Sequence, residues 1–349
     1  MSKGISPVIA SIILILIVIS LAGSFVVFTG RLTSSQTEAA EKQSQQATRT
    51  ATTIFHIEGV SGRTVTLVND GLQTLAVGSV TVSIDDRAVN YTMAGDIAPK
   101  ERGDLTVQGL WSAGRGDHRL TVRGAAGSDS IPITIESVKE EKVLDLRFDE
   151  GTGTAANDVS GNANTGSLGS GNSSRVPAWV AGKFGKALQF DGVDDGVSIA
   201  DSTSLRFTKE FTAEMWVKPT NLAVGQKMLI EKTNANTNGW TFYKTSPNTS
   251  DVQFEFPNIN NEGLLAANAL SNGAWSHIVL TVKNRVGSIY TNGDLEISRT
   301  WTVDGIVSTD ALWIGSRAGS GLFFDGTIDE LRVYTIAYAP DELYVMKRR

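Results

Sequence analysis

The chain has 349 residues, which is enough for two or three domains of ordinary size. Hydrophobic residues make up 41% and charged residues 19%, a composition that suits buried cores and argues against global disorder. The net charge of −6 argues against a nucleic-acid-binding protein, because such proteins normally carry a basic face. The absence of cysteine excludes disulfides, thiolate zinc sites and cysteine nucleophiles. Three widely separated histidines, His56, His118 and His277, argue against a histidine-rich metal site or a histidine-based catalytic triad.

The N-terminal region contains an uncharged segment of 21 residues, from Val8 to Phe28. As a helix it would span the ~30 Å hydrocarbon core of a bilayer. A plain membrane anchor is one interpretation. A secretory signal is a second, but its apolar part is normally only ~7–15 residues long.

A third interpretation places a cleavage before the apolar segment, so that the segment stays on the mature protein. The stretch "SKGISPVIA" resembles the class III signal peptide of archaeal type IV pilins. The resemblance implies that Lys3 and Gly4 form the recognition site of a prepilin peptidase and that Ile5 is the first mature residue. It also implies a membrane-anchored precursor whose helix later packs against other pilin subunits. Bacterial relatives usually carry a glutamate near Ile9, so its absence favours the archaeal type.

The next segment, residues 31–53, is polar and lacks glycine and proline. We expect it to continue the helix as a solvated stalk, with a polar linker as the alternative. Residues 5–53 are therefore predicted to form one hydrophobic helix with a polar extension.

Residues 54–138 change to the two-residue period of β-strands. Segments such as "RTVTLVN", "SVTVSID" and "SIPITIES" alternate apolar and polar residues, and turn residues separate them. This pattern predicts a small β-sandwich, and it resembles the β-rich head of archaeal pilins. We expect Trp111 to lie in a core or an interface. The charged stretch "SVKEEK" marks a domain boundary.

Residues 141–349 carry a series of motifs in a fixed order. They are "VLDLRFDEGTGTAANDVSGNANTG", "WVAGKFGKALQFDGVDDGVSIADSTSL", "FTAEMWVKP", "GAWSHIVLTVKN", "GSIYTNGD", "ALWIGSR" and "FDGTIDELRVYTIAYAPDEL". Together they resemble a laminin-G-like, concanavalin A-like antiparallel jelly roll. Asn292-Gly293 between two strand-like segments predicts a type I′ hairpin. The chain is thus expected to be mainly β, with one N-terminal helix.

Oxygen-bearing side chains occur near both ends of this C-terminal domain, where the first and last strands of a jelly roll are neighbours. Convergence of such ligands without histidine or cysteine suits calcium, and laminin-G-like domains often hold this ion. The sequence predicts one structural Ca²⁺, with turn-capping as the alternative role of these side chains. The predicted ligands are Asp149, Asp158, Asn162 and Asp329.

No catalytic carboxylate pair is evident in the C-terminal domain. Glycosidases of this fold typically carry an E-x-D-x-x-E strand, and the neighbouring acids of "FDE" and "IDE" would point to opposite faces of a strand. We therefore expect binding without catalysis. Aromatic stacking binds sugars, and the candidate ligand-binding residues are Trp301, Tyr243 and Trp240. Three glycosylation sequons begin at Asn90, Asn172 and Asn248.

These parts predict an archaeal pilin-like surface subunit that displays a lectin-like adhesion domain, in an extracellular filament or at the cell surface. Its expected ligand is a glycan or a protein. An uncleaved, monomeric membrane-anchored binding protein is the alternative, and a glycan-processing enzyme is a third candidate.

Overall fold

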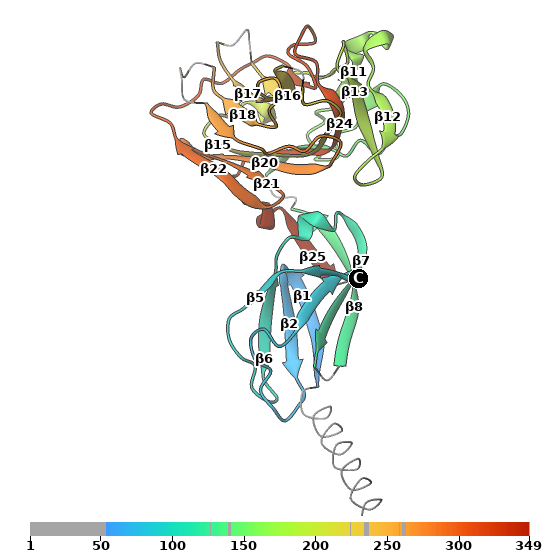
Figure 1. Ribbon diagram of the computed structural model, residues 1–349, viewed down its shortest axis with the longest axis vertical. Coiled ribbons are helices and arrows are strands. Elements are labelled where there is room, and N and C mark those ends of the chain that lie inside the picture. Colours follow the sequence, from blue (N-terminus) through green and yellow to red (C-terminus); the bar gives the residue numbers. More distant parts are fainter. Residues whose placement is uncertain are drawn as a thin grey trace, which may run out of the picture.

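The computed structural model describes residues 54–125, 127–138, 141–223, 225–233, 237–257, 259 and 263–348. The predicted leader, hydrophobic helix and stalk (residues 1–53) lie outside this range. Within it, no helix has both the length and the apolar character needed to cross a membrane. The described residues form two β domains, one above the other in Figure 1.

The first domain, called the head below, is built on a nine-stranded antiparallel sheet. Its strands alternate buried and solvent-facing side chains, as β2 does over "TVTLVN". In spatial order the strands are β4 (Arg87–Val89), β3 (Thr81–Ile84), β7 (Gly116–Gly124), β8 (Gly127–Ser137), β25 (Tyr344–Arg348), β1 (Phe55–Gly62), β2 (Thr64–Asn69), β6 (Arg102–Val107) and β5 (Tyr91–Met93).

The strand β25 comes from the C-terminus of the chain. The sequence assigned residues 141–349 to the second domain, but the strand pairs with β8 over its whole length and with the end of β1. Its side chains Tyr344 and Met346 lie in the core of the head. The second domain is therefore inserted between two neighbouring strands of the head, and Figure 1 shows the red β25 among the blue and green strands.

The second domain packs two antiparallel sheets around one large apolar core. One sheet, the distal sheet, has the order β10 (Ala155–Ala156), β11 (Gly166–Leu168), β14 (Val197–Ile199), β23 (Leu312–Ile314), β16 (Lys227–Lys232), β17 (Trp240–Lys244), β18 (Val252–Glu255) and β19 (Leu264–Ala266). The other, the proximal sheet, has the order β12 (Ala178–Ala181), β13 (Lys186–Asp191), β24 (Asp325–Tyr334), β15 (Glu210–Pro219), β20 (Ser276–Lys283), β21 (Val286–Thr291) and β22 (Asp294–Thr300), and β9 (Lys142–Leu146) pairs with β24.

Short 3-10 turns connect the strands. They are η1 (Leu110–Ser112), η2 (Gly169–Gly171), η3 (Ser173–Arg175), η4 (Thr203–Leu205) and η5 (Pro340–Glu342). The predicted hairpin joins β21 and β22. Both of its central residues have positive φ, 51° at Asn292 and 91° at Gly293, as a type I′ turn requires.

The head covers the outer face of the proximal sheet. Val279 and Tyr334 of this sheet belong to the apolar core of the head. The Trp111 ring stacks on His277, with centroids 5.3 Å apart and planes inclined by 15°, and lies 6.0 Å from Trp216. Trp111 is thus an interface residue, as the sequence predicted.

A buried charge network reinforces the same interface. Arg332, fully buried, donates to Asp145 at 3.0 Å, to Glu214 at 3.2 Å and to the Tyr344 hydroxyl of β25 at 3.0 Å. Arg115 of the head pairs with Glu330 through its Nε at 2.9 Å. Each buried charge has an opposite partner, which offsets the cost of removing it from water.

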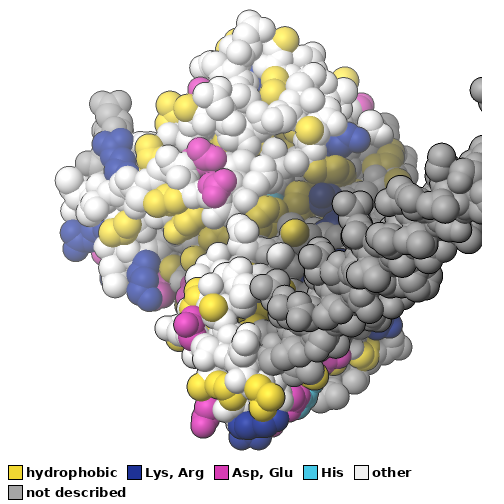
Figure 2. All heavy atoms as spheres, turned by 60° about the horizontal axis from the view of Figure 1, so that its bottom comes forward, with side chains coloured by type: hydrophobic (Ala, Val, Ile, Leu, Met, Phe, Trp, Pro, Cys, Tyr) yellow, Lys and Arg dark blue, Asp and Glu magenta, His cyan; other side chains and the backbone are white. Residues whose placement is uncertain are grey.

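Because the head covers the proximal sheet, the distal sheet faces away from it. In Figure 1, β16, β17 and β18 lie on the far side of the second domain from the head. Figure 2 shows basic and acidic side chains interspersed on the face turned to the viewer.

Candidate functional site

The outer face of the distal sheet carries a row of polar and aromatic side chains. Cross-strand register aligns Ser198 with Trp313, Trp313 with Glu231, Glu231 with Thr241, and Thr241 with Glu255. Side chains alternate between the two faces of a strand. Their neighbours Ile314, Ile230, Phe242 and Phe254 point into the core, so this row points outward.

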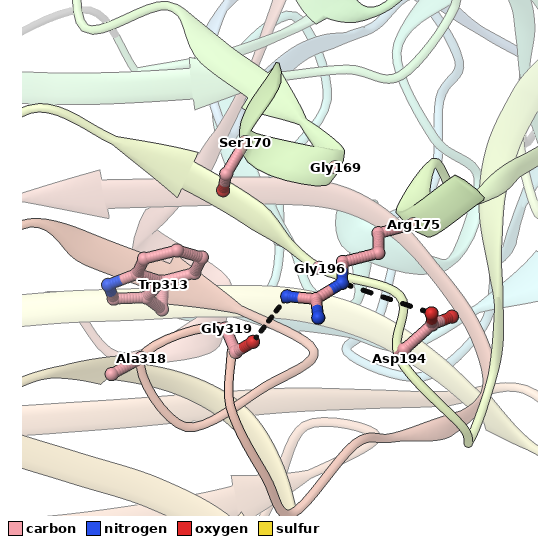
Figure 3. Close-up of a pocket in the computed structure, with 8 residues that line it drawn as sticks. All are labelled: Gly169, Ser170, Arg175, Asp194, Gly196, Trp313, Ala318 and Gly319. Atoms are coloured by element: carbon pink, nitrogen blue, oxygen red, sulfur yellow. Dashed lines mark hydrogen bonds and ion pairs between the residues drawn. The ribbon is translucent and has the colours of Figure 1, made fainter. Parts of the chain in front are cut away.

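A pocket of about 140 Å³ opens beside Trp313 at one end of this row. Figure 3 shows the residues that line it, which come from the η2–η3 segment, the turn before β14, and β23 with the loop after it. They are Gly169, Ser170, Arg175, Asp194, Gly196, Trp313, Ala318 and Gly319. The pocket combines one aromatic ring, one cation, one carboxylate and one hydroxyl.

The polar groups of the pocket are held by one another. Arg175 Nη1 donates to the Gly319 carbonyl at 3.3 Å, and its Nε lies 3.9 Å from a carboxylate oxygen of Asp194. Ser170 donates to Ser198 at 2.9 Å. Trp313 is half-buried. Gly319 lies against the Trp313 ring and also accepts the hydrogen bond of Arg175, which is drawn as a dashed line in Figure 3.

Gly319 shapes the aromatic wall of the pocket. Its φ is +64°, which L side chains rarely adopt, and a Cβ there would lie 2.7 Å from the Trp313 ring. Glycine therefore lets the loop pass over the indole at contact distance.

Glu231 lies beside Trp313 and is fully buried. Its Oε1 accepts a hydrogen bond from the Ala318 N–H at 2.7 Å, and its Oε2 lies 3.6 Å from Arg317 Nε. Burial raises the pKa of Glu231 to about 7, against the opposing effects of the Ala318 amide and Arg317. Through the Ala318 N–H and Arg317, Glu231 fixes the loop that forms one side of the pocket.

Comparison with known proteins concerns the second domain. A family model described as the concanavalin A-like lectin/glucanases superfamily matches residues 191–343. This segment forms a concanavalin A-like domain. The match ends one residue before β25, in agreement with the pairing of that strand in the head. A search of curated proteins gives no significant match.

Several solved structures are similar to this chain. One is domain 4 of AbnA, a GH43 extracellular arabinanase from Geobacillus stearothermophilus, which was solved in complex with arabinotriose. Its identity to this chain is 20% and the TM-score is 0.47, and the match covers 60% of this chain and 98% of that domain. The binding domain of Paraclostridial Mosquitocidal Protein 1 has 16% identity and a TM-score of 0.46, with coverage of 57% and 50%. The botulinum neurotoxin serotype D binding domain has 14% identity and a TM-score of 0.44, with coverage of 58% and 51%. The chain thus spans about half of each toxin binding domain.

The predicted ligand-binding aromatics occupy different places in the concanavalin A-like domain. Trp240 and Trp301 are 1% and 2% exposed and pack in the core among Phe254 and other rings, so neither offers an open ring face to a ligand. Tyr243 lies on the outer face of the distal sheet, and its hydroxyl donates to Glu255 at 2.5 Å. Burial and the Glu255 carboxylate raise the pKa of the Tyr243 phenol well above its usual range.

The predicted calcium ligands lie in two groups. Both oxygens of Asp158 accept hydrogen bonds from the protein, including backbone N–H groups of Asp145 and Asn164, and Asn162 donates to the Lys142 carbonyl. In the second group, Asp149 accepts from the Lys186 N–H and Asp329 from the Phe184 N–H. These bonds are of the kind that turn capping predicts. Among the described residues, Asp149, Asp158 and Asp329 do not belong to one cluster of possible ligands.

A different acidic group is a better candidate for a metal site. Among the described residues, it is the one set of three or more side chains whose possible ligand atoms all lie within 4.8 Å of one another. It consists of Asp191, Asp194 and Asp195. Burial raises the pKa of Asp195, and its acidic neighbours add to this effect. Hard carboxylate oxygens suit calcium chemically, but Asp191 and Asp195 already accept backbone N–H groups within the turn. Calcium binding stays a prediction.

The remaining predicted residues lie on the surface or outside the described residues. Asn90, Asn172 and Asn248 are exposed. Lys3, Gly4 and Ile5 lie outside the described range. The Trp313 pocket was missed from the sequence. The signal was present in "ALWIGSR", because Leu312 and Ile314 point inward and the residue between them must point outward.

Proposed function

We propose that this chain is a surface-displayed binding protein whose concanavalin A-like domain binds carbohydrate in the Trp313 pocket. The supporting observation is the composition of the pocket, in which the half-buried indole of Trp313 lies beside Arg175, Asp194 and Ser170. Sugar rings present apolar C–H faces that stack on aromatic rings and hydroxyls that bond to fixed polar groups. The pocket offers both kinds of contact. The function proposed for it is ligand binding, with no catalytic step.

The arrangement of the domains supports display. The head occupies the proximal sheet, and the pocket opens on the opposite sheet. A ligand on another cell or on a polysaccharide surface therefore reaches the pocket without meeting the head.

We also propose that the chain is displayed as a pilin-like subunit, and the N-terminal sequence supports this. The stretch "KGISPVIA" and the uncharged segment after it fit a prepilin that is cleaved after Gly4 and anchored before assembly. Copies in a filament would bind one surface together, so that weak individual sites give strong avidity. An uncleaved membrane-anchored monomer is the alternative mode of display.

The carbohydrate proposal is tested with the full chain in detergent on a panel of glycans, followed by calorimetric titration of any sugar that binds. We expect Trp313→Ala to weaken binding about tenfold, since an aromatic contact contributes about 1 kcal/mol beyond the area it buries. Trp275→Ala is the matched control, because Trp275 is also half-buried but precedes β20 in the proximal sheet. Equal affinity of both variants and the parent would overturn the assignment of the pocket. Release of reducing ends from a bound glycan would favour the enzyme instead.

The display proposal is tested by mass spectrometry of the N-terminus of the native protein. A mature chain that begins at Ile5 supports prepilin processing. A chain that retains Lys3 and Gly4 supports the uncleaved anchor and leaves the carbohydrate proposal intact.

A further inference from the structure

A second pocket, of about 310 Å³, opens on the same domain. It is lined by residues of β17 and β18 and of the loops beside them, namely Gln226, Tyr243, Thr245, Ser246, Pro247 and Gln253. Like the Trp313 pocket, it combines one aromatic ring with hydroxyl groups, and it adds two side-chain amides. Gln226 and Gln253 are half-buried. Gln253 Nε2 donates to Glu255, which leaves its Oε1 to accept from a ligand.

The two pockets lie on one face of one sheet. Tyr243 follows Thr241 by two residues and pairs with Gln253, so both point outward with the row that begins at Trp313. Neighbouring strands are about 4.8 Å apart, which places Tyr243 roughly 10 Å and Gln253 roughly 14 Å from Trp313, measured across the strands. This separation exceeds a single sugar ring and suits a short chain of them.

Polar groups continue between the pockets. The loop that begins at Arg317 lies beside β16, held by the Ala318 N–H on Glu231 and by the Leu322 carbonyl, which accepts from the Met228 N–H at 2.8 Å. The Arg317 side chain is 32% exposed. Arg317 Nε lies 3.6 Å from Glu231 Oε2, on the strand between those of Trp313 and Tyr243, so the guanidinium lies between the two pockets and can donate to sugar hydroxyls.

We propose that the pocket around Tyr243 and Gln253 is a second subsite for the carbohydrate bound at Trp313, so that the ligand is a linear oligosaccharide lying across β23, β16, β17 and β18. This inference rests on the proposed function, since it extends the same site. Gln253 supplies an amide and Arg317 the contact between the two subsites, while Tyr243, only 6% exposed with its hydroxyl bonded to Glu255, forms the wall of the second pocket. The affinity is therefore expected to grow with the length of the sugar chain.

The test uses the full chain and a series of linear oligosaccharides of one to six units, taken from each polymer type that binds on the glycan panel. We expect the affinity to rise with chain length until both pockets are filled. Gln253→Ala should weaken binding of the hexasaccharide about tenfold, the effect of one or two lost hydrogen bonds, and leave binding of the monosaccharide unchanged. Trp313→Ala should weaken both. Gln226→Ala, in a loop before β16, serves as a second variant if Gln253→Ala melts at a lower temperature.

Each outcome is decisive. Equal affinity for the monosaccharide and the hexasaccharide would contradict a second subsite while leaving the Trp313 pocket in place. The same conclusion would follow if Gln253→Ala and Gln226→Ala each weakened binding of the monosaccharide and of the hexasaccharide equally. Length-dependent binding that neither variant changes would place the extended contacts elsewhere. Absence of binding to every sugar contradicts the proposed function and the second subsite with it.

Discussion

Glu231 is a fully buried acid on the outer face of the distal sheet, between the two pockets. Its Oε1 is occupied by the Ala318 N–H, but its Oε2 has no hydrogen-bond partner and lies 3.6 Å from Arg317. Burial disfavours the carboxylate and raises its pKa from 4.5 to about 7. The protonation of one residue is thus coupled to the loop that shapes the Trp313 pocket.

Because the folded-state pKa of Glu231 is raised, the folded chain binds more protons than the unfolded chain between pH 4.5 and about 7. The free energy of unfolding should therefore fall as the pH rises through this window, by up to about 3 kcal/mol above pH 7. Glu231→Gln keeps the acceptor for Ala318 and removes the titration. We expect it to stabilise the chain at pH 8 and to flatten the pH dependence, as measured by urea unfolding at pH 5, 6, 7 and 8. Glu296→Gln, at an exposed position of β22, is the control. A slope that is the same in Glu231→Gln and the parent would contradict the assigned pKa.

At the scale of elements, local patterns predicted much of the fold. The alternation in β2 and the Asn292-Gly293 turn were visible in the sequence because they depend on neighbouring residues. The partners of β25 were not, because no local pattern records that a C-terminal strand returns to pair with β8 and β1. The Trp313 pocket could not be predicted for the same reason, because three segments that are distant in sequence form it only when β14 pairs with β23.

The role of β25 leads to a prediction for a chain truncated after Leu343. Removal of this strand exposes the edges of β8 and β1 and takes Tyr344 and Met346 out of the core, where each contributes about 2 kcal/mol. Since domains are stable by only about 5–15 kcal/mol, we expect the head to lose cooperative unfolding. Hydrogen exchange of the β1 and β8 amides would measure this loss. Met346→Leu conserves volume and is the matched control. Unchanged protection in the truncated chain would show that β25 is dispensable to the head.

The whole molecule has two chain connections between its domains, one from β8 to β9 and one from β24 through η5 to β25. Arg115, Arg332 and Trp111 add charge pairs and ring contacts across the same interface. These connections hold the proximal sheet against the head and leave the opposite face open. The position of the proposed binding face is therefore a consequence of how the domain is inserted.

Trp111→Ala tests whether the domains act as one body. The indole packs against both His277 and Trp216, which contact each other. Because Trp111 is half-buried, its loss should cost less than the about 3–5 kcal/mol of a fully buried Trp→Ala change. We expect one calorimetric transition in the parent and two in the variant, because the domains would then unfold separately. Trp111→Phe keeps an aromatic ring at this position and should retain one transition. Carbohydrate affinity should stay unchanged, since the Trp313 pocket lies on the other sheet. A single transition in Trp111→Ala would mean that the two chain connections and the buried charges suffice to make the domains unfold together. A loss of sugar binding would show that the proximal and distal sheets are coupled.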